Sequence, residues 1–258
     1  LSLDYQKYLA IIPYKWKVLI KYNQEDIMDW LKTATPYRMT GKSGQLRSEF
    51  ERDQDRIIFS LAFKKLNDKT QVFPIPENQI VHSRMTHSLE AALTHDIGNP
   101  PFGHSGEDAI SHFYRENQGL LSGLSDAQKE DLLKFEGNAQ GFRLLSNIDN
   151  GLKVCANILI AFTKYPRESI VNYRNKNDQD RIDQKKYGAF QSEKHILKKV
   201  VDYFDLPTLA RDSLANIRHP LAYIVEAADD FCYLIMDLED SVKLRLFTRE
   251  TWHMTTVI

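Results

Sequence analysis

Apolar residues recur every three or four positions along much of this 258-residue chain, and that helical period limits the folds that it can adopt. The stretch 52–66 is a clear case: Ile57, Ile58, Leu61, Ala62 and Leu66 recur at three-to-four spacing, and the charged residues stand before Ile57 and directly before Leu66. The pattern returns in 131–145, 152–163, 192–204 and 221–242. Strand-like alternation is scarce, so the sequence predicts a mostly α fold with few or short strands.

Prolines and polar runs mark the connections. Residues 70–76 are expected to be extended, because Pro74 and Pro76 cannot lie inside a helix. The polar stretch 172–186 is typical of a loop or a solvated helix. No internal repeat is visible. We treat 1–27 as an unassigned N-terminal segment and 28–258 as one domain.

The overall charge and composition exclude some classes of protein. A hydrophobic content of 42% excludes a fully disordered chain. Lysine and arginine number 34 against 35 acidic residues, so the formal net charge is -1. That balance argues against a dedicated nucleic-acid binder, although it leaves a local basic patch, and hence nucleic-acid binding, open.

Membrane association is not expected. No apolar run approaches the roughly 18 residues of a membrane helix. The first twenty residues carry charges unlike those of a signal peptide, at Asp4, Lys7, Lys15 and Lys17. The two cysteines, Cys155 and Cys232, lie in apolar runs and form no CxxC pair, so we expect buried, reduced thiols and a cytoplasmic location.

Histidines concentrate in one window. Five of the eight lie between positions 82 and 112, namely His82, His87, His95, His104 and His112. Within 94–107, THDIGNPPFGHSGE, the pair His95-Asp96 precedes a Gly-Asn-Pro-Pro turn that cannot continue a helix. An imidazole and a carboxylate at such a helix end can share one divalent cation; this ligand pair suits Mn, Fe, Co or Ni and tolerates Mg. The dipeptide alone fits a surface histidine beside an acid equally well.

A second pair follows nine residues later. His104 and Glu107 share one helical face at spacing i, i+3. A carboxylate against an imidazole fixes its tautomer and raises its basicity, which a proton-transfer residue needs. A surface ion pair is the alternative, and the position after His95-Asp96 favours the catalytic interpretation.

A further metal ligand is expected within 226–240. Asp229, Tyr233 and Asp237 follow at i, i+4 and i+8, so they line one helical face. Apolar residues surround that face: Ala228, Phe231, Leu234, Ile235 and Leu238. Acids among core residues need partners, such as a cation and a polar substrate. A solvated acidic stripe is the alternative interpretation.

These stretches together resemble the deoxyguanosinetriphosphate triphosphohydrolase (dGTPase) family of the HD superfamily. The resemblance covers most of 28–242, and HDIGNPPFGH is its most specific part. The other matching stretches are RSEFERDQDRIIFSLAFKKLNDKTQVFP (47–74), HSRMTHSLE (82–90), FEGNAQGFRLL (135–145), LIAFTKYPRES (159–169), KKYGAFQSEK (185–194) and RHPLAYIVEAADDFCYLIMDLED (218–240). The fold that this implies is an HD-domain helical bundle with additional helices over 28–258.

The resemblance implies a site for one divalent metal ion. Its ligands would be His87, His95, Asp96 and Asp229. Asp230 is the adjacent alternative, but Asp229 puts on its own face the residues with which relatives read the sugar 3′-hydroxyl, Tyr233 and Asp237. The family's catalytic pair corresponds to His104 and Glu107. The substrate-binding positions near the triphosphate, the sugar or the pocket wall correspond to Arg84, Asn138, Lys164, Tyr165 and Lys186, with Glu136 also in the wall.

The implied reaction is hydrolysis of a deoxynucleoside triphosphate to a deoxynucleoside and tripolyphosphate, by water attack at the α-phosphate. A metal neutralises charge and acidifies a bound water. Arg and Lys side chains hold the phosphates. His104 moves a proton, as acid or as base. Family members are commonly homo-oligomers and some respond to a second, allosteric nucleotide, so both are expected partners beside the substrate.

The chain also departs from the family. His87 and His95 are eight residues apart here, whereas relatives carry them on separate helices. We therefore expect that a family segment is missing near 90–92. Two other functions stay open: an HD phosphohydrolase acting on nucleoside monophosphates or cyclic nucleotides, and a non-catalytic, nucleotide-binding oligomeric regulator.

Overall fold

The computed structural model describes residues 36–38, 49–68, 93–147, 152, 154–170, 186–209 and 213–243. Within these ranges the chain is helical, and strand-type pairing is limited to two isolated bridges, Arg167 with Ala215 and Thr208 with Asn216. The mostly α prediction is therefore confirmed. The predictions for 1–27, 70–76, 90–92 and most of 172–186 concern residues outside the described ranges.

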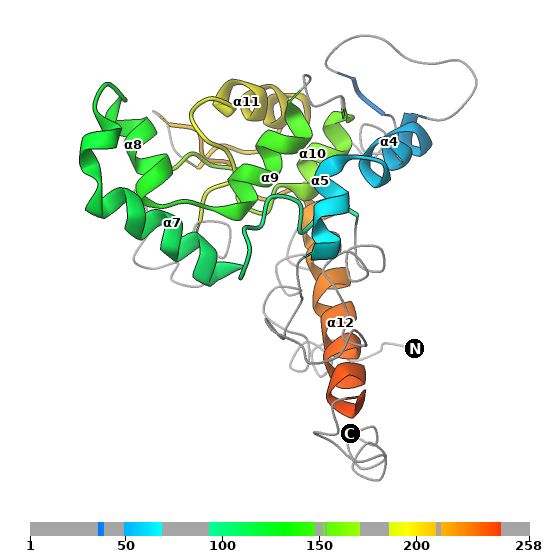
Figure 1. The fold of residues 1–258 in the computed structure, drawn as a ribbon. Helices are drawn as coiled ribbons and strands as arrows, with labels where there is room; N and C mark the ends of the chain where they lie inside the picture. The colour runs from blue at the N-terminus through cyan, green and yellow to red at the C-terminus, as the bar shows by residue number, and fades with distance from the viewer. Residues whose placement is uncertain are drawn as a thin grey trace, which may run out of the picture.

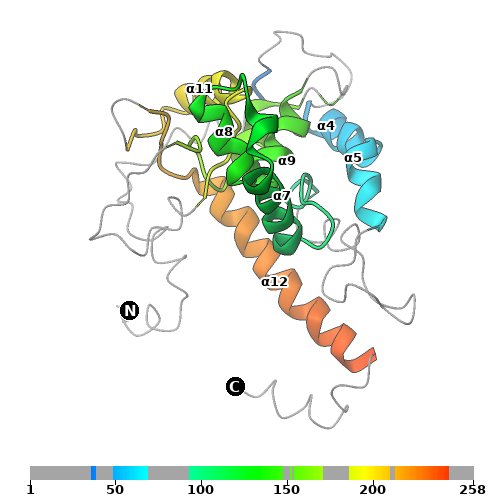
Figure 2. The same cartoon turned by 60° about the vertical axis from the view of Figure 1, so that its left-hand side comes forward.

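Helices account for most of the described residues (Figure 1). In chain order they are α4 (Glu49–Ile58), α5 (Leu61–Lys64), α7 (His104–Glu116), α8 (Asp126–Leu133), α9 (Gly137–Ser146), α10 (Ala156–Phe162), α11 (Lys194–Tyr203) and α12 (Pro220–Lys243). Two short 3₁₀ turns, Lys65–Asp68 and Gln118–Leu121, follow α5 and α7. Figures 1 and 2 show α12 beginning beside the other helices and extending away from them.

Every periodic segment contains a helix, but two of the segments are broken. In 52–66, α4 ends at Ile58 and Ser60 starts α5, because the Ser60 Oγ accepts a hydrogen bond from the Phe63 N–H at 3.1 Å. In 131–145, α8 ends at Leu133 and α9 begins at Gly137. A hydroxyl cap thus interrupts the first segment, and a short irregular link interrupts the second.

The hydrophobic core lies where α9, α10 and α11 meet. Its fully buried residues include Phe142, Leu145, Leu159, Ile160 and Leu197. Burying side chains of this size contributes about 1.5–3 kcal/mol each. Helix α10 also packs against α12, so the core links the compact group of helices to the long one.

A pair of glycines brings the His95-Asp96 segment onto α9. Gly98 has a φ of +103°, and a Cβ there would lie 2.1 Å from the Gly141 backbone nitrogen. A Cβ on Gly141 would in turn lie 2.0 Å from the Ile97 carbonyl oxygen. Residues 93–98 form hydrogen-bonded turns, such as Ile97 N–H to Thr94 C=O at 3.0 Å. The helix end expected at His95-Asp96 is thus a hydrogen-bonded turn over the described residues 93–98.

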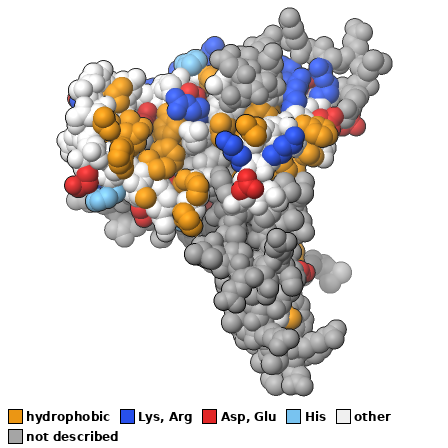
Figure 3. Space-filling view, in the orientation of Figure 1, with side chains coloured by type: hydrophobic (Ala, Val, Ile, Leu, Met, Phe, Trp, Pro, Cys, Tyr) orange, Lys and Arg blue, Asp and Glu red, His pale blue; other side chains and the backbone are white. Residues whose placement is uncertain are grey.

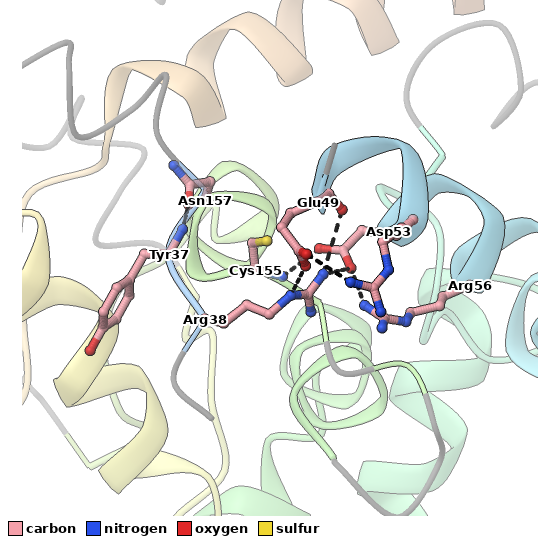
Figure 4. A network of polar contacts seen from close by, with 8 residues as sticks. Tyr37, Arg38, Glu49, Asp53, Arg56, Cys155 and Asn157 are labelled. Carbon is pink, nitrogen blue, oxygen red and sulfur yellow. Dashed lines mark hydrogen bonds and ion pairs between the residues drawn. The ribbon is translucent and has the colours of Figure 1, made fainter. Parts of the chain in front are cut away.

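A buried ionic network attaches α4 to the start of α10 (Figure 4). The Asp53 carboxylate is fully buried and accepts from Arg38 Nη2 at 2.6 Å, Arg56 Nη1 at 2.7 Å and the Cys155 N–H at 2.7 Å. Arg38 also pairs with Glu49. These contacts fix the N-terminal end of α10 relative to α4.

Of the two cysteines, Cys155 is buried as predicted, and burial together with the neighbouring Asp53 raises its pKa to about 12. Cys232 was also predicted to be buried but is only partly buried. In the described ranges no helix combines the length and apolar character that a membrane span requires. On the face in Figure 3, basic side chains lie among acidic and apolar ones, several of them on the side of α4 and α5.

Candidate active site

Asp229 lies beside the consecutive residues His95 and Asp96, although it is far from them in the chain. His95 Nε2 is 3.2 Å from Asp229 Oδ1, contributed by α12, and 3.6 Å from Asp96 Oδ2. The His95 side chain is only 3% exposed, so its contacts with the two carboxylates are buried at the imidazole. The amide of Asn99 donates to Asp96 Oδ1 at 2.5 Å and fixes that carboxylate. One imidazole and two carboxylates form a donor set of the type that divalent metals take.

The complete ligand set stays a prediction. His87 and Arg84 lie outside the described ranges. Among the described side chains, no group of three or more histidines, cysteines or acids meets the geometry of a metal site. The chemistry of the three donors present nonetheless fits the predicted metal, and His87 would supply the fourth.

Lys164 connects this cluster to a loop after α10. Its Nζ lies 3.4 Å from Asp229 Oδ2. The next residue, Tyr165, is buried, and burial raises the pKa of its phenol. The predicted substrate residue Lys164 is therefore adjacent to the predicted metal ligand Asp229, and Tyr165 follows it in the chain.

His104 and Glu107 form the predicted pair at the start of α7. His104 Nδ1 is 2.8 Å from Glu107 Oε2, and the Gly137 N–H donates to Glu107 Oε1 at 2.7 Å. Burial alone would raise the pKa of Glu107, but these two hydrogen bonds and the Lys186 ammonium hold it below its ordinary value. Glu107 is buried, whereas the His104 side chain is 84% exposed and open to a substrate.

Lys186 links Glu107 to Glu136. Its Nζ lies 3.2 Å from Glu107 Oε2 and 2.9 Å from Glu136 Oε2. Burial raises the pKa of Glu136 to about 7, although Lys186 opposes that shift. The pKa of Lys186 is raised against its own burial by the hydrogen bond with Glu136 and the charges of both carboxylates. The break between α8 and α9 therefore places Glu136 in this network, beyond the pocket-wall role expected for it.

The remaining predicted positions lie on α9 and α12. Asn138 is partly buried in the first turn of α9. Tyr233 and Asp237 follow Asp229 along α12 at the predicted spacing, and Tyr233 is exposed. The expectation that core residues surround this face is wrong in part. Phe231 is 66% and Leu234 67% exposed, because this half of α12 extends away from the other described helices.

Two residues near the site were not predicted from the sequence. Asn99 orients Asp96, and its position three residues after Asp96 in the turn was an available signal. Arg218 is buried directly before α12, where its Nε donates to the Lys164 carbonyl at 2.6 Å. No local pattern marks Arg218, since its contacts with Lys164 and Tyr165 come from another part of the chain.

No family model matches the chain. A deoxyguanosinetriphosphate triphosphohydrolase-like protein from Pseudomonas aeruginosa is 38% identical over 85% of this chain and 58% of its own length. One from Synechocystis sp. is 37% identical over 83% of this chain and 60% of its own length. A deoxyguanosinetriphosphate triphosphohydrolase from Klebsiella pneumoniae is 31% identical over 78% and 51%, respectively.

This chain belongs to the deoxyguanosinetriphosphate triphosphohydrolase family. It spans about half to three fifths of the length of the family members that it matches. The alignment with the Pseudomonas aeruginosa relative is 270 positions long but includes only about 219 residues of this chain. The relative therefore has about 50 residues there to which no residue of this chain corresponds. The missing segment expected near 90–92 stays a prediction, because 69–92 lie outside the described ranges.

Proposed function

We propose that this chain carries the catalytic site of a metal-dependent hydrolase that converts a deoxynucleoside triphosphate, such as dGTP, into a deoxynucleoside and tripolyphosphate. The family relationship supports the substrate class. The observation that carries the proposal is the approach of Asp229 Oδ1 to within 3.2 Å of His95 Nε2, with the Lys164 ammonium beside the same carboxylate. That arrangement combines side chains that can bind a metal ion with a lysine ammonium that can bind phosphate.

His95, Asp96 and Asp229, with His87, would hold the divalent metal ion. When bound, the ion would neutralise phosphate charge and lower the pKa of a bound water. Lys164 is adjacent to these ligands and would pair with phosphate oxygens. A compact ammonium is suited to that role as a point charge.

Proton transfer is assigned to His104. Because the pKa of Glu107 is lowered, its carboxylate is ionised at neutral pH and can only accept hydrogen bonds. The Nδ1 of a neutral His104 must then carry the proton that it donates to Glu107. That tautomer leaves Nε2 as the basic nitrogen, which can exchange a proton with the attacking water or the departing 5′ oxygen.

The phosphorus-containing product distinguishes the candidate functions. The chain is incubated with each of the four deoxynucleoside triphosphates and Mn²⁺ or Mg²⁺, and the phosphorus products are identified. We expect tripolyphosphate. Pyrophosphate or orthophosphate as the first product would contradict the proposal, and activity confined to monophosphates or cyclic nucleotides would favour another type of HD phosphohydrolase. Nucleotide-dependent assembly without product release would favour a regulator.

A further inference from the structure

Arg218 is a buried arginine that joins two parts of the candidate site. Its side chain is fully buried. The guanidinium carbon lies 5.4 Å from the centre of the Tyr165 ring and 4.9 Å from that of Tyr223, so it is close enough to both rings for cation–π contact. A guanidinium removed from water in this way needs an anion and hydrogen-bond acceptors.

Its polar partners lie on two different segments. Nε donates to the Lys164 carbonyl at 2.6 Å, and Nη1 pairs with the Glu226 carboxylate on α12. Glu226 is itself buried. The loop that carries Lys164 is thus connected through one guanidinium to the first half of α12.

These two attachments lie next to chemically important side chains. Glu226 precedes Asp229 by three positions on α12, so the two are neighbours on the helix surface. The Lys164 ammonium in turn lies 3.4 Å from Asp229. A closed ring of contacts therefore runs from Lys164 through Arg218, Glu226 and α12 to Asp229 and back to Lys164.

We propose that Arg218 is a positioning residue that fixes Asp229 and Lys164 relative to each other and so sets the affinity of the site for its metal ion. The inference rests on the proposed function for the identity of that site. Lysine could not replace Arg218, because a single ammonium lacks the planar fork that reaches a carboxylate and a carbonyl while lying against two rings.

The test uses the full chain and direct titration with Mn²⁺. The first variant combines Arg218→Met with Glu226→Gln, which removes both charges of the pair together. This avoids leaving an unpaired buried charge, which by itself would destabilise the fold strongly. The second variant, Arg218→Lys, keeps the positive charge and provides an independent result if the first does not fold.

A matched control removes another buried Arg–Glu pair. Arg38→Met with Glu49→Gln acts in the network of Figure 4, which joins α4 to the start of α10 and includes none of the predicted site residues. Thermal unfolding of all the variants shows whether the two double variants lose similar stability.

We expect the Mn²⁺ dissociation constant to rise about tenfold in Arg218→Met/Glu226→Gln, and by a smaller factor in Arg218→Lys, as found for residues that orient metal ligands. The control should stay within about twofold of the parental chain. An unchanged dissociation constant in both Arg218 variants would overturn the proposal, as would an equal rise in the control or a parental chain that binds no Mn²⁺. The proposed function fails in a different way, namely if the parental chain binds Mn²⁺ but releases no tripolyphosphate.

Discussion

At the scale of single residues, the proposed proton transfer depends on one exposed imidazole held by one buried carboxylate. Glu107 is fixed by the Gly137 N–H and by Lys186, so it gives His104 a defined tautomer and orientation. His104 contributes little to folding, because most of its side chain is exposed. Catalysis and stability should therefore separate at this position.

Replacement of His104 by alanine tests that separation. We expect His104→Ala to lower kcat by about 10²–10⁴-fold, the range of general acid–base catalysis, while Mn²⁺ and nucleotide binding persist. Turnover is measured by product release and binding by titration. His112→Ala, at an exposed position of the same helix α7, is the control. A near-parental rate in His104→Ala would show that another group transfers the proton.

Residue spacing predicted pairs that are close in sequence better than pairs that are distant. The contact of His104 with Glu107 follows directly from helical geometry. The residues of 226–240 indicate Asp229 as a candidate ligand and the family resemblance groups it with His95, but no helical period could place the two side chains together. Arg218 escaped prediction because burial, two tyrosine rings and a distant carbonyl define its role, and only the folded chain brings these together.

At the scale of helices, apolar periodicity located the elements but not their ends. The period runs through Ser60 in 52–66, yet the hydroxyl of Ser60 caps a new helix there. Similarly, the turn geometry around His95 depends on Gly98 and Gly141 lying against each other, which is a contact between elements. Local side-chain hydrogen bonds and close backbone packing therefore set the boundaries.

The attachment of α4 to α10 through Asp53 gives a prediction of stability. Asp53→Ala leaves Arg38 with Glu49 alone and removes the carboxylate that Arg56 and the Cys155 N–H contact, so we expect a loss of about 3 kcal/mol in the free energy of unfolding. Urea denaturation measures it. Asp202→Ala, which breaks a surface pair with Lys198, should cost less than about 1 kcal/mol. Equal losses in the two variants would mean that the buried network does not stabilise the fold.

The start of α12 gives a prediction about pH. His219 Nδ1 accepts a hydrogen bond from the Leu221 N–H at 3.0 Å, and burial lowers the pKa of His219 to about 4. The ordinary value is about 6.5, so between pH 6.5 and 4 the unfolded chain binds a proton that the folded chain does not. This residue's contribution to stability is therefore present above pH 6.5 and is lost as the pH falls towards 4.

His219→Asn should remove that contribution to the pH dependence, because asparagine can cap the helix without titrating. Urea denaturation at pH 7 and pH 4.5 should show a smaller loss of stability on acidification in the variant than in the parental chain. His195→Asn, at an exposed position of α11, should leave the loss unchanged. If His219→Asn and the parental chain lose the same stability, His219 does not weaken the fold in acid.

At the scale of the whole molecule, two polar clusters lie on one helical framework. His95, Asp96, Asp229 and Lys164 form one, and His104, Glu107, Lys186 and Glu136 form the other. Helix α9 contacts both segments, because Gly141 packs on Ile97 and the Gly137 N–H bonds to Glu107. The proposed division of work follows: the first cluster neutralises phosphate charge and the second moves a proton.

Hydrolysis of dGTP in water enriched in ¹⁸O tests the proposed reaction most directly. With Mn²⁺ present, water attack at the α-phosphorus predicts tripolyphosphate that carries one ¹⁸O atom and a deoxynucleoside that carries none, both detectable by mass spectrometry. Label in the deoxynucleoside, or pyrophosphate or orthophosphate as the first phosphorus product, would contradict the proposed reaction.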